Sequence, residues 1–194
     1  MLEWLKKFIP SPFKRVAKRA LTSAWESFLY GIARQHVNRS DLKHIIFVCK
    51  GNICRSAFAE KYMGALLNGR MVTIESCGLD VDQGGFSPRE AVLVAREFGT
   101  ELDSHRSKGL SACNFNEADL IVAMEYRQYC RLLNLFPEKG AAICVLREFA
   151  PWPDRLLCNI YDPYGLGEKS FRRCFRKMAK ALDSLRQMTI DRTL

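Results

Sequence analysis

The chain has 194 residues, of which 48% are hydrophobic, and this is enough for one packed domain with an additional segment. Its net charge of +9 is concentrated near the N-terminus, where residues 1–44 contain nine Lys or Arg and three Asp or Glu. The rest of the chain lacks the interleaved basic and aromatic residues that stack bases, so we do not expect nucleic-acid binding. No run of about 18 apolar residues occurs, which excludes a membrane-spanning helix.

Residues 1–43 are predicted to form a basic amphipathic extension. After Pro12, apolar residues recur every three or four positions, as on one face of a helix: Phe13, Val16, Ala17, Ala20, Leu21, Ala24, Trp25, Phe28, Leu29 and Ile32. Basic residues flank this stripe (Lys14, Arg15, Lys18 and Arg19), so residues 13–34 suit the surface of an anionic membrane. Docking on the domain or on a dimer partner, a transit peptide and disorder are the alternatives.

From His44 onward, short β-rich runs alternate with helical patterns, which predicts an α/β domain over residues 44–194 with helices flanking a four-stranded parallel sheet. Strands are expected at His44–Cys49, Val72–Ser76, Leu120–Met124 and Ala142–Leu146. Helices are expected at Ser56–Leu67, Glu125–Phe136 and Glu168–Gln187. Another helix should begin with Ser87 as its N-cap, Pro88 as its first residue and Glu90 completing a capping box, and end at Gly99. The stretch Arg147–Gly167 is expected to be a long loop.

The eight cysteines are spread along the chain without paired spacing, and no secretory signal precedes them. We therefore expect free thiols in a reducing cytoplasm. Cys49 and Cys54 have no second cysteine cluster or nearby histidine with which to complete a tetrahedral site. The sequence thus predicts neither a metal nor another cofactor.

The stretch "VCKGNICRS", residues 48–56, joins the strand "HIIFVC" to a helical pattern. Such a turn aims backbone N–H groups and the positive end of the helix dipole at one point, which suits a bound phosphate. Cys49 would be stabilised there as a thiolate, and the guanidinium of Arg55 can grip two phosphate oxygens. Gly51 is expected to permit the tight turn, and Ser56 to donate its hydroxyl to the sulfur. Burial of both cysteines as simple apolar filler is the alternative.

With this loop, four further stretches resemble the low-molecular-weight protein tyrosine phosphatases in the expected order: "ESCGL", "LDSHRSK", "ADLIVAM" and "DPYG". The resemblance runs from His44 to the C-terminus and implies hydrolysis of phosphotyrosine through a phosphocysteine. It implies Cys49 as the nucleophile, Arg55 as the phosphate clamp and Asp162 as the general acid. The rest of the phosphate-binding loop is then Lys50, Gly51, Asn52, Ile53, Cys54 and Ser56, which Ser76 and His105 brace.

The segment after Ser76 departs from the animal members of that family. Leu79 and Asp82 stand where those members carry an aromatic wall, which resembles the bacterial branch associated with exopolysaccharide systems. Tyr164 remains as an aromatic wall on which an aryl phosphate can stack, with Leu79 as the second wall residue. Lys50 either strengthens phosphate binding or faces solvent.

Asp162 is the candidate acid because a phenolate or alkoxide leaves poorly without a proton, and the long loop lies at the carboxyl edge of the sheet. His105 is either a bracing residue or an alternative acid. Cys54 is expected to capture a peroxide-oxidised Cys49 as a reversible disulfide, with a buried filler role as the alternative.

Two other functions compete with the phosphatase. Arsenate reductases share the fold but relay a disulfide through a close cysteine pair after the third strand, whereas the nearest cysteines here are Cys113 and Cys130. A non-catalytic phosphotyrosine-binding module is expected to lack the nucleophile or the acid. The favoured partner is therefore a phosphotyrosine-containing protein, with a tyrosine kinase as one candidate, and the expected location is cytoplasmic with peripheral attachment to the membrane.

Overall fold

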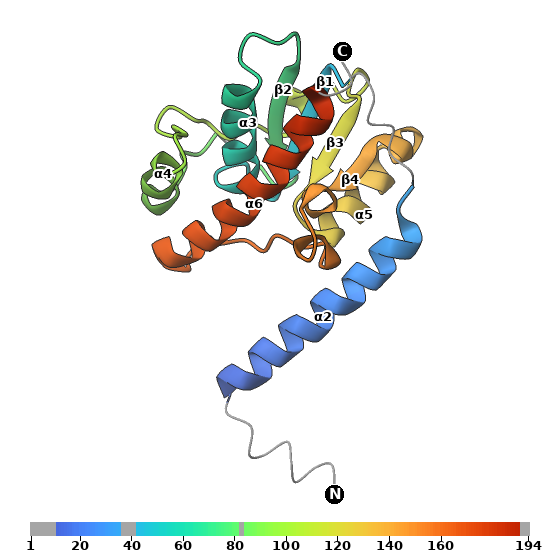
Figure 1. Cartoon of the computed structure of the whole chain (residues 1–194), viewed down its shortest axis with the longest axis vertical. Helices are drawn as coiled ribbons and strands as arrows, with labels where there is room; N and C mark the ends of the chain where they lie inside the picture. The colour runs from blue at the N-terminus through green and yellow to red at the C-terminus, as the bar shows by residue number, and fades with distance from the viewer. Residues whose placement is uncertain (1–10, 36–41, 82–83, 191–194) are drawn as a thin grey trace, which may run out of the picture.

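The computed structural model describes residues 11–35, 42–81 and 84–190, and their side chains from Lys18 to Thr189. Four parallel strands form one sheet in the order β2-β1-β3-β4 (Figure 1). They are β1 (His44–Cys49), β2 (Thr73–Gly78), β3 (Leu120–Ala123) and β4 (Ile143–Val145). The predicted fold class is confirmed, and each expected strand overlaps an observed one.

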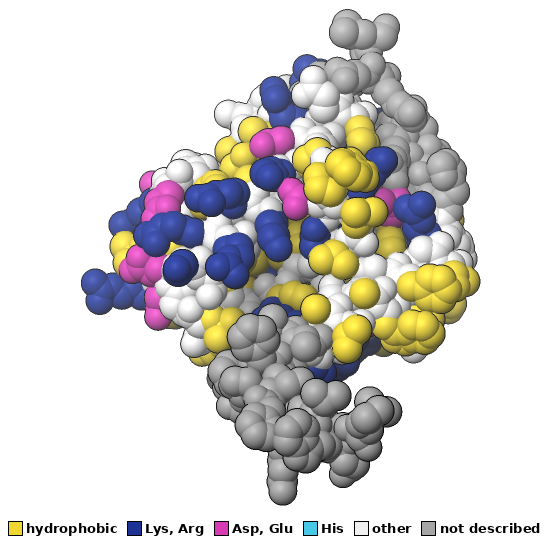
Figure 2. Space-filling view, turned by 60° about the horizontal axis from the view of Figure 1, so that its bottom comes forward, with side chains coloured by type: hydrophobic (Ala, Val, Ile, Leu, Met, Phe, Trp, Pro, Cys, Tyr) yellow, Lys and Arg dark blue, Asp and Glu magenta, His cyan; other side chains and the backbone are white. Residues whose placement is uncertain are grey.

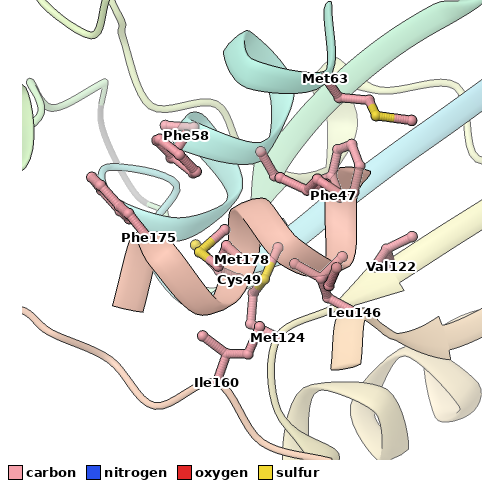
Figure 3. Packing of buried hydrophobic residues seen from close by; sticks show 14 of the residues in the cluster. Phe47, Cys49, Phe58, Met63, Val122, Met124, Leu146, Ile160, Phe175 and Met178 are labelled. Carbon is pink, nitrogen blue, oxygen red and sulfur yellow. The ribbon is translucent and has the colours of Figure 1, made fainter. Parts of the chain in front are cut away.

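Helices cover both faces of the sheet. On one face, α3 (Arg55–Leu66), α4 (Arg89–Arg96) and α6 (Gly167–Ile190) pack with Ile45 and Phe47 of β1. On the other, α5 (Tyr126–Leu135) packs with Ile46 and Val48. Figure 3 shows Phe58 of α3 stacked on Phe175 of α6, with ring centroids 4.1 Å apart. Because β1 is buried on both faces, its carboxyl end is held rigidly where the phosphate loop begins.

Two local predictions were wrong. Helix α4 begins at Arg89 with Pro88 as its N-cap, because Pro88 has an extended backbone (φ −64°, ψ 151°). No side chain caps this end, so the box predicted between Ser87 and Glu90 does not form. The stretch Arg147–Gly167 is not a continuous loop either, because 3₁₀ turns occur at Leu146–Phe149 and Asp154–Leu156.

The N-terminal extension forms a helix, α2 (Ser11–Ala33), that lies beside α5 and docks on the domain through polar side chains (Figure 1). Glu26 accepts hydrogen bonds from Arg127 (3.1 Å) and Asn159 (2.5 Å), and Ser27 accepts one from the backbone N–H of Cys158 (2.9 Å). Tyr30 is 5% exposed and donates its hydroxyl to Glu148. Of the alternatives for the extension, α2 therefore follows docking on the domain. Its contacts with Cys158 and Asn159 lie in the segment that leads to Asp162.

The predicted apolar stripe of α2 does not make these contacts. Leu21, Trp25, Phe28 and Ile32, called here the apolar face of α2, are 58–73% exposed. The side chains of Phe13, Val16 and Ala17 lie outside the described residues. Within the described ranges, no helix combines the length and apolar character that crossing a bilayer requires.

Candidate active site

The phosphate loop runs from Cys49 at the end of β1 to Arg55 at the start of α3. Gly51 was expected to provide its tight turn, but the left-handed residue is Asn52, with φ 49°. An Asn tolerates this conformation better than most residues, because its short polar side chain can bond locally. The side chain of Asn52 is fully buried and makes those bonds.

Asn52 is the centre of the network that braces the loop. Its amide nitrogen donates to the hydroxyls of Ser56 (2.9 Å) and Ser76 (2.7 Å), and its amide oxygen accepts from the backbone N–H of Lys108 (2.8 Å). Ser76 in turn donates to Glu60, a residue that the sequence patterns did not identify. This network fixes the strained turn, so the loop is held in one shape before any ligand binds.

Cys49 is 2% exposed, with its sulfur at the base of the loop. The Ser56 hydroxyl lies 3.0 Å from the sulfur, and the backbone N–H of Asn52 donates to it at 3.3 Å. Both contacts surround the sulfur with hydrogen-bonding groups of the loop and of α3. The adjacent Cys54 is also buried, and burial, followed by the charges of Asp162 and Cys49, raises the pKa of its thiol.

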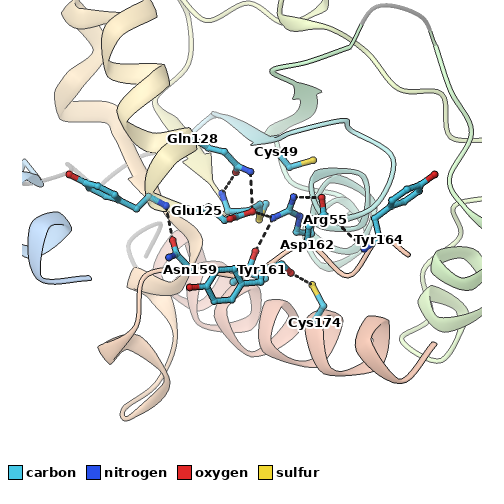
Figure 4. Close-up of polar contacts among 12 residues, drawn as sticks. Cys49, Arg55, Glu125, Gln128, Asn159, Tyr161, Asp162, Tyr164 and Cys174 are labelled. Carbon is cyan, nitrogen blue, oxygen red and sulfur yellow. Dashed lines mark hydrogen bonds and ion pairs between the residues drawn. The ribbon is translucent and has the colours of Figure 1, made fainter. Parts of the chain in front are cut away.

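Arg55 is 1% exposed and lies between two carboxylates (Figure 4). One terminal nitrogen donates to Glu125 and to the carbonyl of Ile160 (3.0 Å), and the other donates to Asp162 (2.8 Å). Burial opposes its charge, but Cys49, Asp162 and Glu125 outweigh burial and raise its pKa. Its Nε–H is buried without a hydrogen-bond partner among the described residues. The guanidinium is therefore permanently charged and keeps a donor for an added oxyanion.

Besides Glu60, the sequence patterns missed Glu125 and Gly78. Glu125 precedes α5 and is 70 residues from Arg55, so only the fold brings the pair together. Gly78 ends β2 beneath the phosphate loop, where a Cβ would lie 2.8 Å from the Lys50 carbonyl oxygen and 3.0 Å from the Asn52 nitrogen. A glycine in "ESCGL" could have suggested such an approach, but the loop that it touches is over 20 residues away in the chain.

The structure brings the other predicted residues to the same edge of the sheet, with different exposures. His105 is buried, with its Nε2 2.7 Å from the Asn52 carbonyl oxygen, and burial lowers its pKa. Tyr164 is 61% exposed, whereas Leu79 is 8% exposed and packs in the core. Lys50 is exposed and Ile53 half-buried. Asp82 lies outside the described residues.

Beyond Cys49 and Cys54, several cysteines have hydrogen-bond partners. The thiol of Cys113 hydrogen-bonds that of Cys77, and Cys130 hydrogen-bonds Tyr126. All eight cysteines are free. Among the described residues, no group of His, Cys, Asp or Glu is arranged to hold a metal ion.

A buried cysteine in a turn from strand to helix, with a buried arginine and a nearby carboxylate, is the arrangement typical of a cysteine-dependent phosphatase. The family model for low molecular weight phosphotyrosine protein phosphatases matches residues 44–193, so the chain belongs to that family. The predicted family and enzyme class are confirmed.

Individual relatives agree with this assignment. The chain is 32% identical to low molecular weight protein-tyrosine phosphatase A of Mycobacterium tuberculosis, over 79% of this chain and 95% of the relative. It is 31% identical to the low molecular weight protein-tyrosine-phosphatase Wzb of Escherichia coli, over 73% and 96%. The crystal structure of the tyrosine phosphatase AmsI of Erwinia amylovora superimposes with a TM-score of 0.68 at 26% identity, over 77% and 94%.

Proposed function

We propose that the chain hydrolyses phosphotyrosine in proteins, with Cys49 as the nucleophile. The Cys49 thiolate attacks phosphorus, and the bond from phosphorus to the tyrosine oxygen breaks. Asp162 gives its proton to that oxygen, which leaves as a neutral phenol. The Arg55 guanidinium and the loop N–H groups hold the phosphoryl oxygens, where charge develops. Tyr164 offers a face on which the tyrosine ring stacks.

In the second step, water attacks the phosphocysteine. Asp162, now a carboxylate, takes a proton from the water, and the sulfur leaves as a thiolate while inorganic phosphate is released. His105 has a bracing role in this proposal, since its Nε2 contacts the backbone of Asn52 and its lowered pKa keeps the ring neutral. Glu125 orients Arg55 from the side opposite Asp162.

One observation carries the proposal: the Nε–H of Arg55 is buried without a partner among the described residues, beside a loop whose Asn52 N–H donates to the Cys49 sulfur. A buried donor without a partner costs free energy, and a phosphate oxygen is a natural partner. A non-catalytic phosphotyrosine-binding module would explain the cradle but not a cysteine at its base.

The test is hydrolysis of an aryl phosphate by Cys49→Ser beside Cys130→Ser, a matched thiol deletion on α5. We expect Cys49→Ser to lose at least about three orders of magnitude in kcat while still binding an oxyanion, because the alcohol is not ionised. Cys130→Ser should retain activity. Turnover by Cys49→Ser within tenfold of the parent would refute the assignment.

The favoured substrate is a phosphotyrosine-containing protein, with a tyrosine kinase as one candidate, because the matched relatives Wzb and AmsI are named protein-tyrosine phosphatases. An Asp162→Ala variant should bind the phosphoprotein and release it slowly. Proteins retained from a lysate by Asp162→Ala, and displaced by vanadate, would be identified by mass spectrometry. Absence of any phosphotyrosine protein from that set would count against this substrate class.

Peripheral attachment to an anionic membrane is the second part of the proposal. The apolar face of α2 stays exposed after the polar face has docked, and the exposed Lys18 and Arg19 are on the same helix. Aromatic side chains at such a face insert at the lipid interface, while Lys and Arg meet anionic headgroups. The catalytic domain would then be held at the bilayer without a change in its fold.

The membrane test uses Trp25→Ser/Phe28→Ser, which alters the apolar face of α2 but leaves its docking contacts intact. Sedimentation with phosphatidylglycerol vesicles should decrease at least about fivefold for this variant, and the parent's binding should weaken in high salt. Equal sedimentation of variant and parent, or none for either, would contradict the attachment.

A further inference from the structure

A cavity of about 390 Å³ lies between α2, the acid segment 157–163 and α6. This volume falls in the range of small-molecule sites. The phosphate loop, residues 49–56, does not line the cavity, and Asp162 is the one residue that it shares with the proposed catalytic set. Figure 4 shows the contact between the Cys174 thiol and the Tyr161 carbonyl (3.8 Å), which lies close to Arg55 and Asp162. The cavity is therefore separate from the phosphate cradle but touches the segment that carries the acid.

The extension makes one wall of the cavity. Arg19, Ala20 and Ser23 of α2 line it, and these residues precede the segment matched by the family model, which begins at residue 44. The part of the chain that the family model covers therefore does not contain this wall. A ligand in the cavity would contact α2 and α6 at once, across the acid segment.

The lining is strongly cationic. Arg19, Arg147, Arg173 and Lys177 line the cavity, whereas Asp162, the acidic side chain among them, is paired with Arg55. Within the described part of the chain, no ion pair joins Arg173 or Lys177 to a carboxylate. Figure 2 turns the side with α2 toward the viewer and shows Lys and Arg side chains gathered near the centre of that face.

These cations act on one another. Burial, together with repulsion from Arg147 and Arg173, lowers the pKa of Lys177, while Asp154 and Cys174 act in the opposite sense. Asp154 itself is engaged by Lys180 (3.2 Å) and Arg147 (3.8 Å). The excess positive charge around the cavity is thus left for a ligand to neutralise.

Buried polar atoms also lack partners here. The Ser23 hydroxyl, the Arg147 Nε–H and the Tyr161 hydroxyl have no hydrogen-bond partner among the described residues, and all three side chains line the cavity. Ser23 is 4% exposed and Arg147 5% exposed. Buried donors without partners are rare in folded proteins, so three around one cavity point to an acceptor that occupies it.

The remaining lining combines Asn159 and Ser170 with apolar residues, among them Ala20, Leu157, Pro163 and Leu166. We propose that the cavity binds a soluble anionic amphiphile, a phosphate group joined to a short apolar group, as a second site behind the acid segment. The phosphate is held by Arg173 and Lys177, and the apolar group fills the space between α2 and the acid segment. This site does not depend on the proposed catalytic roles.

The experiment is a site-resolved amide NMR titration of the full chain with hexylphosphonate, which resists hydrolysis. Signals of the phosphate loop report the active site, whereas signals of residues 19–23 and 170–177 report the cavity. Arg173→Ala/Lys177→Ala removes two lining charges. The matched control is Lys169→Ala/Arg176→Ala, which removes two exposed charges from the same helix outside the lining.

We expect the cavity signals to shift with a Kd that the lining variant weakens at least about tenfold and the control weakens less than about twofold. Methylphosphonate should bind the cavity at least about fivefold more weakly than hexylphosphonate, because it buries less apolar surface. Shifts in the phosphate loop alone, or equal weakening by both double variants, would overturn the proposal. Cavity signals that respond to phosphatidic acid vesicles but not to hexylphosphonate would also overturn it, because the anion contact would then belong to a lipid surface.

Discussion

Replacing Tyr30 with Ala should release α2 from the domain. Tyr30 is 5% exposed and meets Tyr129 edge to face, with ring centroids 5.0 Å apart. Its hydroxyl accepts from the Val145 N–H (3.2 Å) and donates to Glu148, and burial raises the pKa of Tyr30, so the hydroxyl keeps its proton. These contacts join α2 to the end of β4.

The expected loss follows from these contacts. Truncating a buried aromatic ring to Ala costs about 3–5 kcal/mol of unfolding free energy. The edge-to-face pair accounts for about 0.5–1.5 kcal/mol of this loss. Tyr30→Phe keeps the ring but leaves the buried Val145 N–H without its acceptor, so it should cost about 1–3 kcal/mol.

Urea unfolding followed by circular dichroism at 222 nm measures these losses. Trp25→Ala is the matched control, because Trp25 is an aromatic residue of the same helix that is 60% exposed. It should change the unfolding free energy by less than about 0.5 kcal/mol. If Tyr30→Ala and Trp25→Ala cost the same within that margin, α2 does not dock through its polar face and the reasoning is wrong.

Three further outcomes are expected. Asp162→Ala should slow substrates with poor leaving groups at least about tenfold more than activated aryl phosphates, since only the former need the proton; equal losses in kcat/KM would indicate a structural role. Cys54→Ser should leave hydrolysis nearly intact but prevent a thiol reductant from restoring activity after peroxide treatment. The reason is that Cys54 is expected to condense with the sulfenic acid of Cys49, releasing water and forming a disulfide. Unchanged recovery of activity in the variant would refute this. Burial lowers the pKa of His105, so the folded state disfavours its protonation, and the unfolding free energy should fall as pH drops below about 6.5. Chemical denaturation between pH 7.5 and 5 should show a weaker pH dependence for His105→Asn than for the parent. An equal pH dependence in both proteins would contradict this account.

The sequence predicted the parts of the site that depend on neighbouring residues. A buried strand, a short turn and a helix follow one another within residues 44–66, so the phosphate loop could be located without its partners. The position of Asp162 at the same sheet edge followed from the order of the parallel strands. Within the loop, the assignment of the tight turn to Gly51 failed, because the hydrogen bonds of Asn52 to Ser76 and Lys108 offset its strain.

Contacts between distant residues could not be predicted in this way. Nothing near Arg55 indicates that Glu125 will pair with it, and nothing near β2 indicates that Gly78 will lie under the loop. Apolar periodicity predicted that α2 is helical but not which face docks. The docked face is polar because Glu26 and Ser27 accept hydrogen bonds from the Asn159 side chain and the Cys158 backbone N–H. Only the folded domain places these two donors next to α2.

The ion pair between Arg55 and Asp162 has a consequence for the timing of catalysis. Arg55 and Asp162 form an ion pair across 2.8 Å. A phosphate dianion that takes both edges of the guanidinium must exchange places with the Asp162 carboxylate. The carboxylate is then released from Arg55 at the moment when the phosphoryl group arrives. Substrate entry would thus exchange the partner of Arg55 and free Asp162 to face the leaving group.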